Sequence, residues 1–290
     1  MELRWKASMS ATCLHAANCA AEGLEISDPQ LANALQPAID QLHQELVACG
    51  LPFETTLPLL GSLAAEYENN RQLVEVTVTK LRGAGSICDD TIARLAGSIA
   101  DLEVALLRER PNLADELAVR GRPLRELWEA RGPGLLREVA RLVGDESFLV
   151  SSAEIVLVAP LAGGHGRASR SGNRVTFEAV LVDPYPELPE TIRLGWLLAQ
   201  LGCHLPRFGE AVSGNRLPQV ASLATLPLVL AAAETVELAM LSPDSIEQAL
   251  RCWQLPQEVR DCLHTWWQAY FTGNSRWAVA LASLDAMLAS

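Results

Sequence analysis

Residues 154–159 read Glu-Ile-Val-Leu-Val-Ala, and residues 174–182 read Arg-Val-Thr-Phe-Glu-Ala-Val-Leu-Val. Both stretches are rich in β-branched residues and have the length of a half-buried strand. They are the clearest strand patterns in the chain, and the Gly-rich segment 163–173 between them is expected to be a long hairpin loop. We therefore expect a mainly α-helical protein with a small β-hairpin or sheet, in the α+β class.

Helical patterns dominate the sequence before these strands. Residues 27–29 (Ser-Asp-Pro) have the form of a helix start, and the helix that follows is expected to end near Cys49. A second helix is expected over 55–82, and a third begins at Ser86, with apolar residues recurring at spacings of three and four. Short connections favour antiparallel neighbours, so residues 1–110 are expected to form a helical bundle.

Residues 111–290 are expected to form a second, hairpin-containing helical domain, or to continue the first as one domain. Glycine and proline at 131–134 predict a turn between two short helices. Two further helices are expected at 190–201 and 226–241. Another helix is expected to start at 242–244, and a tryptophan-rich pair of helices is expected within 258–288. The aromatic residues of this pair recur at helical spacing, which is typical of a core.

The composition is that of a globular, acidic protein. Of its 290 residues 49% are hydrophobic and 20% charged, and the net charge is −12. Without a basic stripe, the chain lacks the lysine and arginine clusters that bind nucleic acid.

Seven scattered cysteines with no Cys-x-x-Cys pair predict reduced thiols in a cytoplasm. Polar residues over 8–18 argue against an export signal, and 217–233 is too polar for a membrane span. We expect a soluble, cytoplasmic protein with neither nucleic acid nor membrane as a partner.

Segment 163–173 is the most polar part of the chain and contains His165, Arg167 and Arg170. Backbone N–H groups and two guanidinium groups predict an anion-binding site, to which Arg193 of the following helix would add a third guanidinium. The alternative is a solvated hairpin loop, because phosphate loops normally run from a strand into a helix and here a strand follows.

The candidate catalytic residues are His165, Glu190 and Glu234. Glu234 follows a long apolar run, so its carboxylate must find a partner, be exposed or have a raised pKa. The alternatives are an ordinary salt bridge or an exposed position for Glu234, and a solvated loop position for His165.

Cysteine and histidine also occur close together in sequence, but only one or two residues apart, which places them on different faces of a helix. These pairs are Cys13 with His15, Cys203 with His204 and Cys262 with His264. Zinc-finger spacing and the Glu-x-x-His motif of di-iron bundles are absent. The sequence therefore predicts no metal site and no cofactor.

The expected order of a hairpin, a helix over 189–201 and an apolar helix carrying Glu234 resembles the core of zincin-like metallopeptidases, over about residues 150–240. That resemblance implies an active-site helix after a strand and a later helix that offers a glutamate ligand. The His-Glu-x-x-His motif is missing, because residues 190–196 read Glu-Thr-Ile-Arg-Leu-Gly-Trp, so zinc binding and water activation are not carried over. Segments 128–136 and 188–201 are also similar to an uncharacterised bacterial family, which adds no chemistry.

Two functions of different classes follow from these patterns. The first is a non-catalytic scaffold protein that binds a protein or peptide. Such a protein would be a pseudoenzyme with a decayed peptidase-like fold. The alternative is an enzyme of unrecognised class that acts on a small anionic substrate between loop 163–173 and the helices of Glu190 and Glu234. Nucleophile-elbow, Walker, Rossmann and kinase motifs are all absent, which favours the first. The sequence leaves the oligomeric state open.

Overall fold

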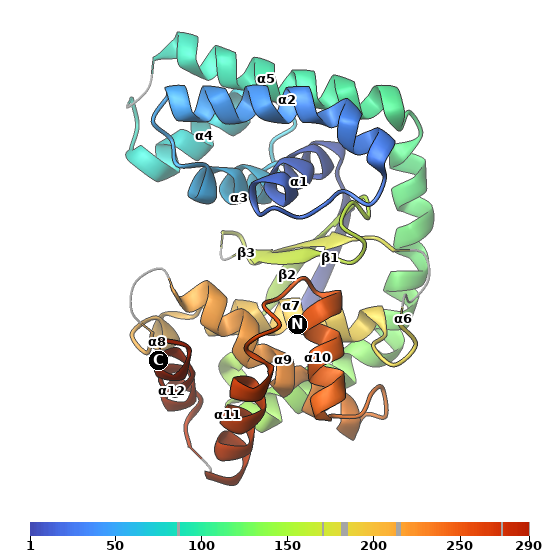
Figure 1. Ribbon diagram of the computed structural model, residues 1–290, viewed down its shortest axis with the longest axis vertical. Helices are drawn as coiled ribbons and strands as arrows, with labels where there is room; N and C mark the ends of the chain where they lie inside the picture. The colour runs from blue at the N-terminus through green and yellow to red at the C-terminus, as the bar shows by residue number, and fades with distance from the viewer. Residues whose placement is uncertain (86–87, 170, 181–184, 213–215, 274, 290) are drawn as a thin grey trace.

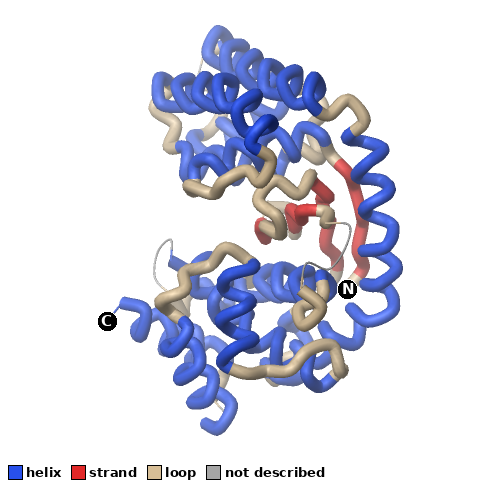
Figure 2. Tube along the Cα trace, turned by 45° about the vertical axis from the view of Figure 1, so that its right-hand side comes forward, coloured by secondary structure: helices blue, strands red, loops and turns tan. Residues whose placement is uncertain are grey.

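The computed structural model describes residues 1–85, 88–169, 171–180, 185–212, 216–273 and 275–289. Over these residues the protein is mainly α-helical with one small mixed sheet, which confirms the expected fold class. The sheet lies between helices α1–α5 on one side and α7–α12 on the other, and the long helix α6 runs along its flank (Figures 1 and 2).

The sheet has the strand order β1-β2-β4-β3. Its strands are β1 (Glu2–Ala7), β2 (Ser152–Val158), β3 (Gly166–Ser169) and β4 (Arg174–Glu178). Strand β2 pairs in parallel with both β1 and β4, whereas β3 is antiparallel to β4.

The predicted hairpin between 154–159 and 174–182 is therefore wrong. Its two strands are parallel neighbours, and the connection 159–173 is long enough for a crossover. The antiparallel partner of β4 is β3, which lies inside the segment expected to be a loop. Strand β3 reads Gly-Arg-Ala-Ser, which has no strand propensity of its own, so pairing with β4 decides its conformation. Residues 181–182 lie outside the described residues.

The first helix after β1 is α1 (Met9–Ala21), which no predicted helix covers. The next helices largely follow the predicted order and are α2 (Pro29–Ala48), α3 (Phe53–Leu63), α4 (Asn70–Arg82) and α5 (Asp89–Glu109). Asp28 rather than Ser27 caps α2, because its carboxylate accepts from the N–H groups of the first turn. The helix predicted over 55–82 is two helices, since Asn69 caps a new start at α4. The predicted start at Ser86 lies outside the described residues.

Helix α6 (Leu113–Val143) is continuous through Pro123 and Pro133, so the turn predicted at 131–134 is wrong. Packing of α6 against the sheet, α7 and α9 outweighs the loss of single backbone hydrogen bonds at proline. Gly121 allows the close approach, because a Cβ at this position would lie 2.4 Å from Leu157 Cδ1.

The C-terminal half is helical around a tryptophan-rich core. A short 3₁₀ turn η1 (Glu146–Phe148) precedes β2, and the helices after the sheet are α7 (Glu190–Cys203), α8 (Pro206–Gly209), α9 (Leu217–Thr235), α10 (Pro243–Cys252), α11 (Arg260–Gly273) and α12 (Trp277–Ala289). Helix α9 begins and ends earlier than predicted, whereas α7 and α10 agree with prediction. The tryptophans at 253, 266, 267 and 277 are buried as expected, but Phe271 is 62% exposed.

One hydrophobic core extends from α1 to α12, and β1 joins the predicted bundle 1–110 to the sheet of the predicted second domain. Helix α9 is long and apolar enough to cross a membrane, but 78% of its most apolar window is buried inside the protein, as in the core helix of a soluble protein. Helices α2 and α3 pass the same test only together, as a pair bent by 117°.

Candidate functional site

A buried polar cluster lies where the three parallel strands end. Strands β1, β2 and β4 run in the same direction, so their carboxyl ends meet at one edge of the sheet. Helix α1 starts directly after β1, and segment 159–165 passes over the end of β4. This edge is where open parallel sheets usually hold their ligands.

Glu178, the last residue of β4, is the centre of the cluster. Its carboxylate accepts four backbone N–H groups, at 3.0 Å from Leu161, 2.7 Å from Ala162, 2.7 Å from Gly164 and 2.9 Å from His165. The side chain is 0% exposed. Segment 161–165 therefore does bind an anion through its backbone, and that anion is the chain's own carboxylate.

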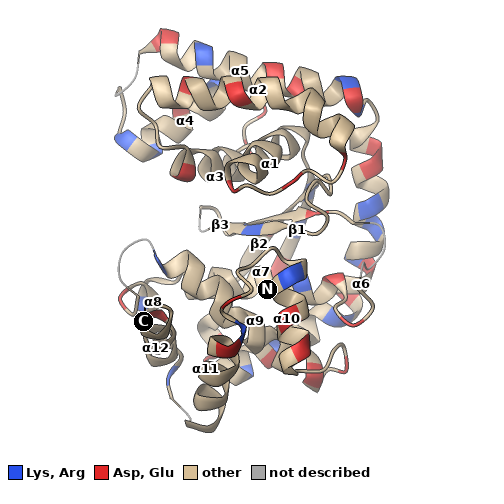
Figure 3. Cartoon of the chain, viewed as in Figure 1, with Lys and Arg blue, Asp and Glu red and all other residues tan. Residues whose placement is uncertain are grey.

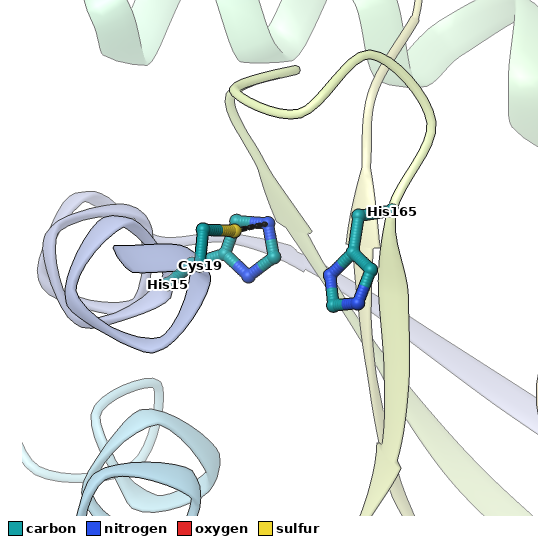
Figure 4. A group of neighbouring side chains, drawn as sticks. All are labelled: His15, Cys19 and His165. Carbon is teal, nitrogen blue, oxygen red and sulfur yellow. Dashed lines mark hydrogen bonds between the residues drawn. The ribbon is translucent and has the colours of Figure 1, made fainter. Parts of the chain in front are cut away.

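His15, Cys19 and His165 surround this carboxylate. His15 Nε2 lies 2.9 Å from Glu178 Oε1 and 3.6 Å from Cys19 Sγ. The rings of His15 and His165 stack with centroids 5.4 Å apart, and Figure 4 shows His165 pointing from the strand side toward α1. The Nε2 atom of His165 is 3.7 Å from Glu22 Oε2, and its buried Nδ1 has no hydrogen-bond partner in the described part of the chain.

Arg193 of α7 contacts the backbone of the cluster. Its guanidinium donates to the carbonyl oxygens of His165 and Glu178, each at 2.7 Å, and pairs with the carboxylate of Glu190 one turn earlier. The same group lies 3.8 Å from the centre of the Phe177 ring. Arg193 is only 1% exposed, so its guanidinium does not face solvent or an external ligand.

The cluster shifts the pKa values of its members in opposite directions. Burial disfavours the charged form of His15, but Cys19 and Glu178 outweigh burial and raise its pKa to about 10. Burial likewise opposes ionisation of Glu178, but His15 and the backbone N–H groups lower its pKa to about 2. Burial, and then the charge of His15, lower the pKa of His165 to about 4. At neutral pH a charged His15 therefore lies between an ionised Glu178 and a neutral His165.

The arrangement of Cys19, His15 and Glu178 does not form a nucleophilic triad. A cysteine nucleophile needs a histidine that faces the thiol with one ring nitrogen and the acid with the other. Here both contacts involve Nε2 of His15, and Cys19 is 0% exposed. The cavity beside His15 measures about 10 Å³, which is enough for one water molecule and too small for a substrate.

Several residues predicted from sequence do meet in this cluster, but not as an open anion site. His165, Glu190 and Arg193 belong to it, and Arg167 pairs with Glu22 at its edge. Two of the three predicted anion-binding arginines are thus held in internal ion pairs. Arg170 lies outside the described residues.

Glu234 lies elsewhere, at the exposed end of α9. It lines a surface cavity of about 330 Å³ between α6, α9, α10 and α11, which we call the C-terminal cavity. Arg141, His264, Trp267 and Phe271 also line this cavity. Glu190 and Glu234, expected to share one site, therefore line different cavities.

His15, Cys19 and Glu178 are not among the site residues predicted from sequence. His15 and Cys19 are four residues apart on α1, a spacing that places two side chains on one helix face, unlike the neighbouring Cys13 and His15. Glu178 interrupts the apolar pattern of 174–182, and a carboxylate inside a buried strand indicates a polar site.

No family model, curated protein or solved structure matches this chain. Its fold and site define an α+β protein with a small mixed sheet, a buried polar cluster at the carboxyl edge of that sheet, and an open cavity among its C-terminal helices.

Proposed function

We propose that this chain is a non-catalytic binding protein that takes an apolar, basic segment of a partner protein into the C-terminal cavity. One observation carries this proposal. The C-terminal cavity combines ligand-sized volume with aromatic walls and an exposed carboxylate, whereas the polar cluster at the sheet edge is closed.

The shape and lining of the C-terminal cavity suit an apolar side chain. Its volume of about 330 Å³ is at the lower end of ordinary ligand pockets. Trp267 forms part of the wall, while Phe271, which also lines the cavity, is 62% exposed. An exposed aromatic residue at a pocket is typical of surfaces that bind a partner.

The charge around the cavity favours a basic partner. Glu234 lies in the last turn of α9, where the free carbonyl groups of the helix add partial negative charge. It has no ion pair among the described residues, whereas Arg141 is paired with Glu138 at 2.6 Å. Acidic positions occur on helices on both sides of the sheet (Figure 3), and the net charge of −12 attracts a cationic partner from a distance.

The alternative function, an enzyme acting on a small anionic substrate, has weaker support. It requires free guanidinium groups in loop 163–173 and on α7, but Arg167 and Arg193 are held by Glu22 and Glu190. The zincin-like ancestry of the scaffold likewise stays a proposal. Its support is the order of an antiparallel edge strand, a helix packed on the sheet and the apolar α9 packed on that helix.

The test is fluorescence anisotropy with a short labelled peptide of leucine and lysine at amphipathic helical spacing. We expect this basic peptide to bind, and two matched peptides, with lysine replaced by glutamate or leucine by serine, to bind much more weakly. Phe271→Ser should raise Kd about 10-fold, because an aromatic anchor contributes more than 1 kcal/mol. Glu234→Gln should raise Kd several-fold at low ionic strength and little at high salt.

A matched control is Val119→Ser on α6, because Val119 is also an exposed apolar residue, 66% exposed, but does not line the C-terminal cavity. It should bind like the unmodified protein. Equal binding of the basic and the acidic peptide, or unchanged binding by both cavity variants, would contradict the proposal.

A further inference from the structure

Three side chains of the types that bind zinc converge at the carboxyl edge of the sheet. They are His15 and Cys19 on α1 and His165 in the segment before β3 (Figure 4). One ligand atom from each lies within 4.8 Å of the others, and all three residues are buried. Residues far apart in sequence thus supply two imidazoles and a thiol to one small volume.

The spacing of two of these atoms, Cys19 Sγ and His15 Nε2, agrees with that of a tetrahedral zinc site. Zinc bonds of about 2.3 Å to sulfur and about 2.0 Å to nitrogen place the two ligand atoms about 3.5 Å apart at a tetrahedral angle. The distance between Cys19 Sγ and His15 Nε2 is 3.6 Å. Both residues are on one helix face, four residues apart, so the helix itself maintains this distance.

The third side chain presents an unused donor atom. His165 is 8% exposed, and its Nδ1 is buried without a hydrogen-bond partner among the described residues. A buried ring nitrogen without a partner is costly for the folded state, and such a group calls for an explanation. The other ring nitrogen, Nε2, faces Glu22 at 3.7 Å. In metal sites, a carboxylate commonly accepts a hydrogen bond from the ring nitrogen that does not bind the metal, which leaves the other ring nitrogen unprotonated. In His165 these two atoms would be Nε2 and Nδ1, respectively.

The surrounding charges suit a divalent cation with a thiolate ligand. Zinc binding releases the proton that His15 Nε2 donates to Glu178 and the proton of the Cys19 thiol, after which the ion and the Cys19 thiolate leave one positive charge in the interior. The carboxylate of Glu178 lies 2.9 Å from His15 Nε2, and that of Glu22 faces His165. A neutral buried site is possible without any new group, which removes the main electrostatic cost of binding an ion in an apolar interior.

We infer that His15, Cys19 and His165 bind one Zn²⁺ ion. A mixed set of imidazole and thiolate selects zinc over magnesium and calcium, which prefer oxygen ligands. The remaining tetrahedral position is left for an oxygen, from water or from Glu178 Oε1. The ion ties α1 to the segment that covers the end of β4, and this role is independent of peptide binding in the C-terminal cavity.

The first test is the metal content of the full-length chain, purified without a tag or chelator and kept reduced. We expect one zinc per chain, and recovery of one zinc per chain after chelation and reloading. Co²⁺ in place of zinc should give the visible absorption of a tetrahedral site and a near-ultraviolet thiolate-to-cobalt charge-transfer band. The charge-transfer band reports the Cys19 ligand directly.

Variants then assign the ligands. Cys19→Ala and His165→Ala should each weaken zinc binding more than about 100-fold, because loss of a ligand exceeds the 10- to 100-fold effect of changes behind a ligand. Glu22→Gln, which changes no ligand but alters the group behind His165 and its ion pair with Arg167, should weaken zinc binding by about 10-fold. The cobalt charge-transfer band should disappear in Cys19→Ala and persist in His165→Ala.

Two controls match these variants. Cys13 is a buried thiol on the same helix, and the Nε2 atom of His43 is likewise buried without a hydrogen-bond partner in the described part of the chain. Cys13→Ala and His43→Ala should retain the metal. The near-ultraviolet circular dichroism of the tryptophan core checks that each variant is folded. Substoichiometric zinc in the unmodified protein with the metal in excess, or a folded Cys19→Ala variant that binds zinc as tightly as the unmodified protein, would overturn the inference.

Discussion

The imidazole of His15 and the carboxylate of Glu178 are joined by a hydrogen bond of 2.9 Å, and their side chains are 4% and 0% exposed. This bond connects α1 to the end of β4, across 163 positions of sequence. Because the four backbone N–H groups of segment 161–165 point at the same carboxylate, one side chain organises a helix, a strand and a connecting segment.

Replacing Glu178 by glutamine should therefore destabilise the protein strongly. The amide has one acceptor oxygen instead of two, and its NH₂ group would face backbone donors. We expect a loss of about 3 to 5 kcal/mol in the free energy of unfolding, as for other buried pairs that lose one partner. Urea unfolding measures this loss, and Glu75→Gln at an exposed helix position is the matched control. A loss no larger than that of Glu75→Gln would show that the carboxylate is not the centre of the cluster.

The stability of the metal-free protein should be greatest near pH 6.5. The pKa of His15 is raised from 6.5 to about 10, so its contribution is complete below 6.5 and is lost as the pH rises toward 10. The pKa of His165 is lowered from 6.5 to about 4, so stability is lost as the pH falls through that range. The pKa of Glu178 is lowered from 4.5 to about 2, which adds a further loss at more acidic pH.

Urea midpoints measured across this pH range, with a chelator present, test these signs. His15→Asn should flatten the alkaline side of the profile, and His165→Asn should flatten the side between pH 6.5 and 4. An alkaline side that stays unchanged in His15→Asn would rule out the assigned role of that imidazole.

The sequence predicted the parts of this site that depend on local patterns. His165, Arg167 and Arg193 were found because they lie in a polar Gly-rich segment or in the first turns of a clear helix. His15 and Cys19 meet Glu178 because β1 pairs in parallel with β2, about 150 residues later, and β2 pairs in parallel with β4. No local pattern specifies that pairing. The same limit explains the wrong hairpin, since strand propensity is the same for parallel and antiparallel neighbours and says nothing of their relative direction.

The buried ion pair between Arg193 and Glu190 should show strong coupling. Arg193→Met leaves the carboxylate of Glu190 buried without its guanidinium and removes two hydrogen bonds to the segment around Glu178. We expect a loss of about 3 to 5 kcal/mol. Adding Glu190→Gln to Arg193→Met should recover about 1 to 3 kcal/mol of that loss, because a neutral amide costs less to bury beside a methionine than a carboxylate does. Denaturant unfolding of the two single variants and the double variant measures the coupling, and strictly additive losses would argue against the pair.

Two helix glycines offer a paired test of the packing between α7 and the segment before β2. A Cβ at Gly202 would lie 2.4 Å from the backbone oxygen of Phe148, which cannot move away as a side chain could. Gly202→Ala should therefore cost about 1 to 3 kcal/mol through overpacking. Gly97 in the middle of α5 is exposed and would meet no atom within 4 Å, so Gly97→Ala should stabilise the protein by about 0.5 to 1 kcal/mol through helix propensity. Thermal unfolding should move in opposite directions for the two variants, and a shift in the same direction would mean that the contact at Phe148 is not as close as described.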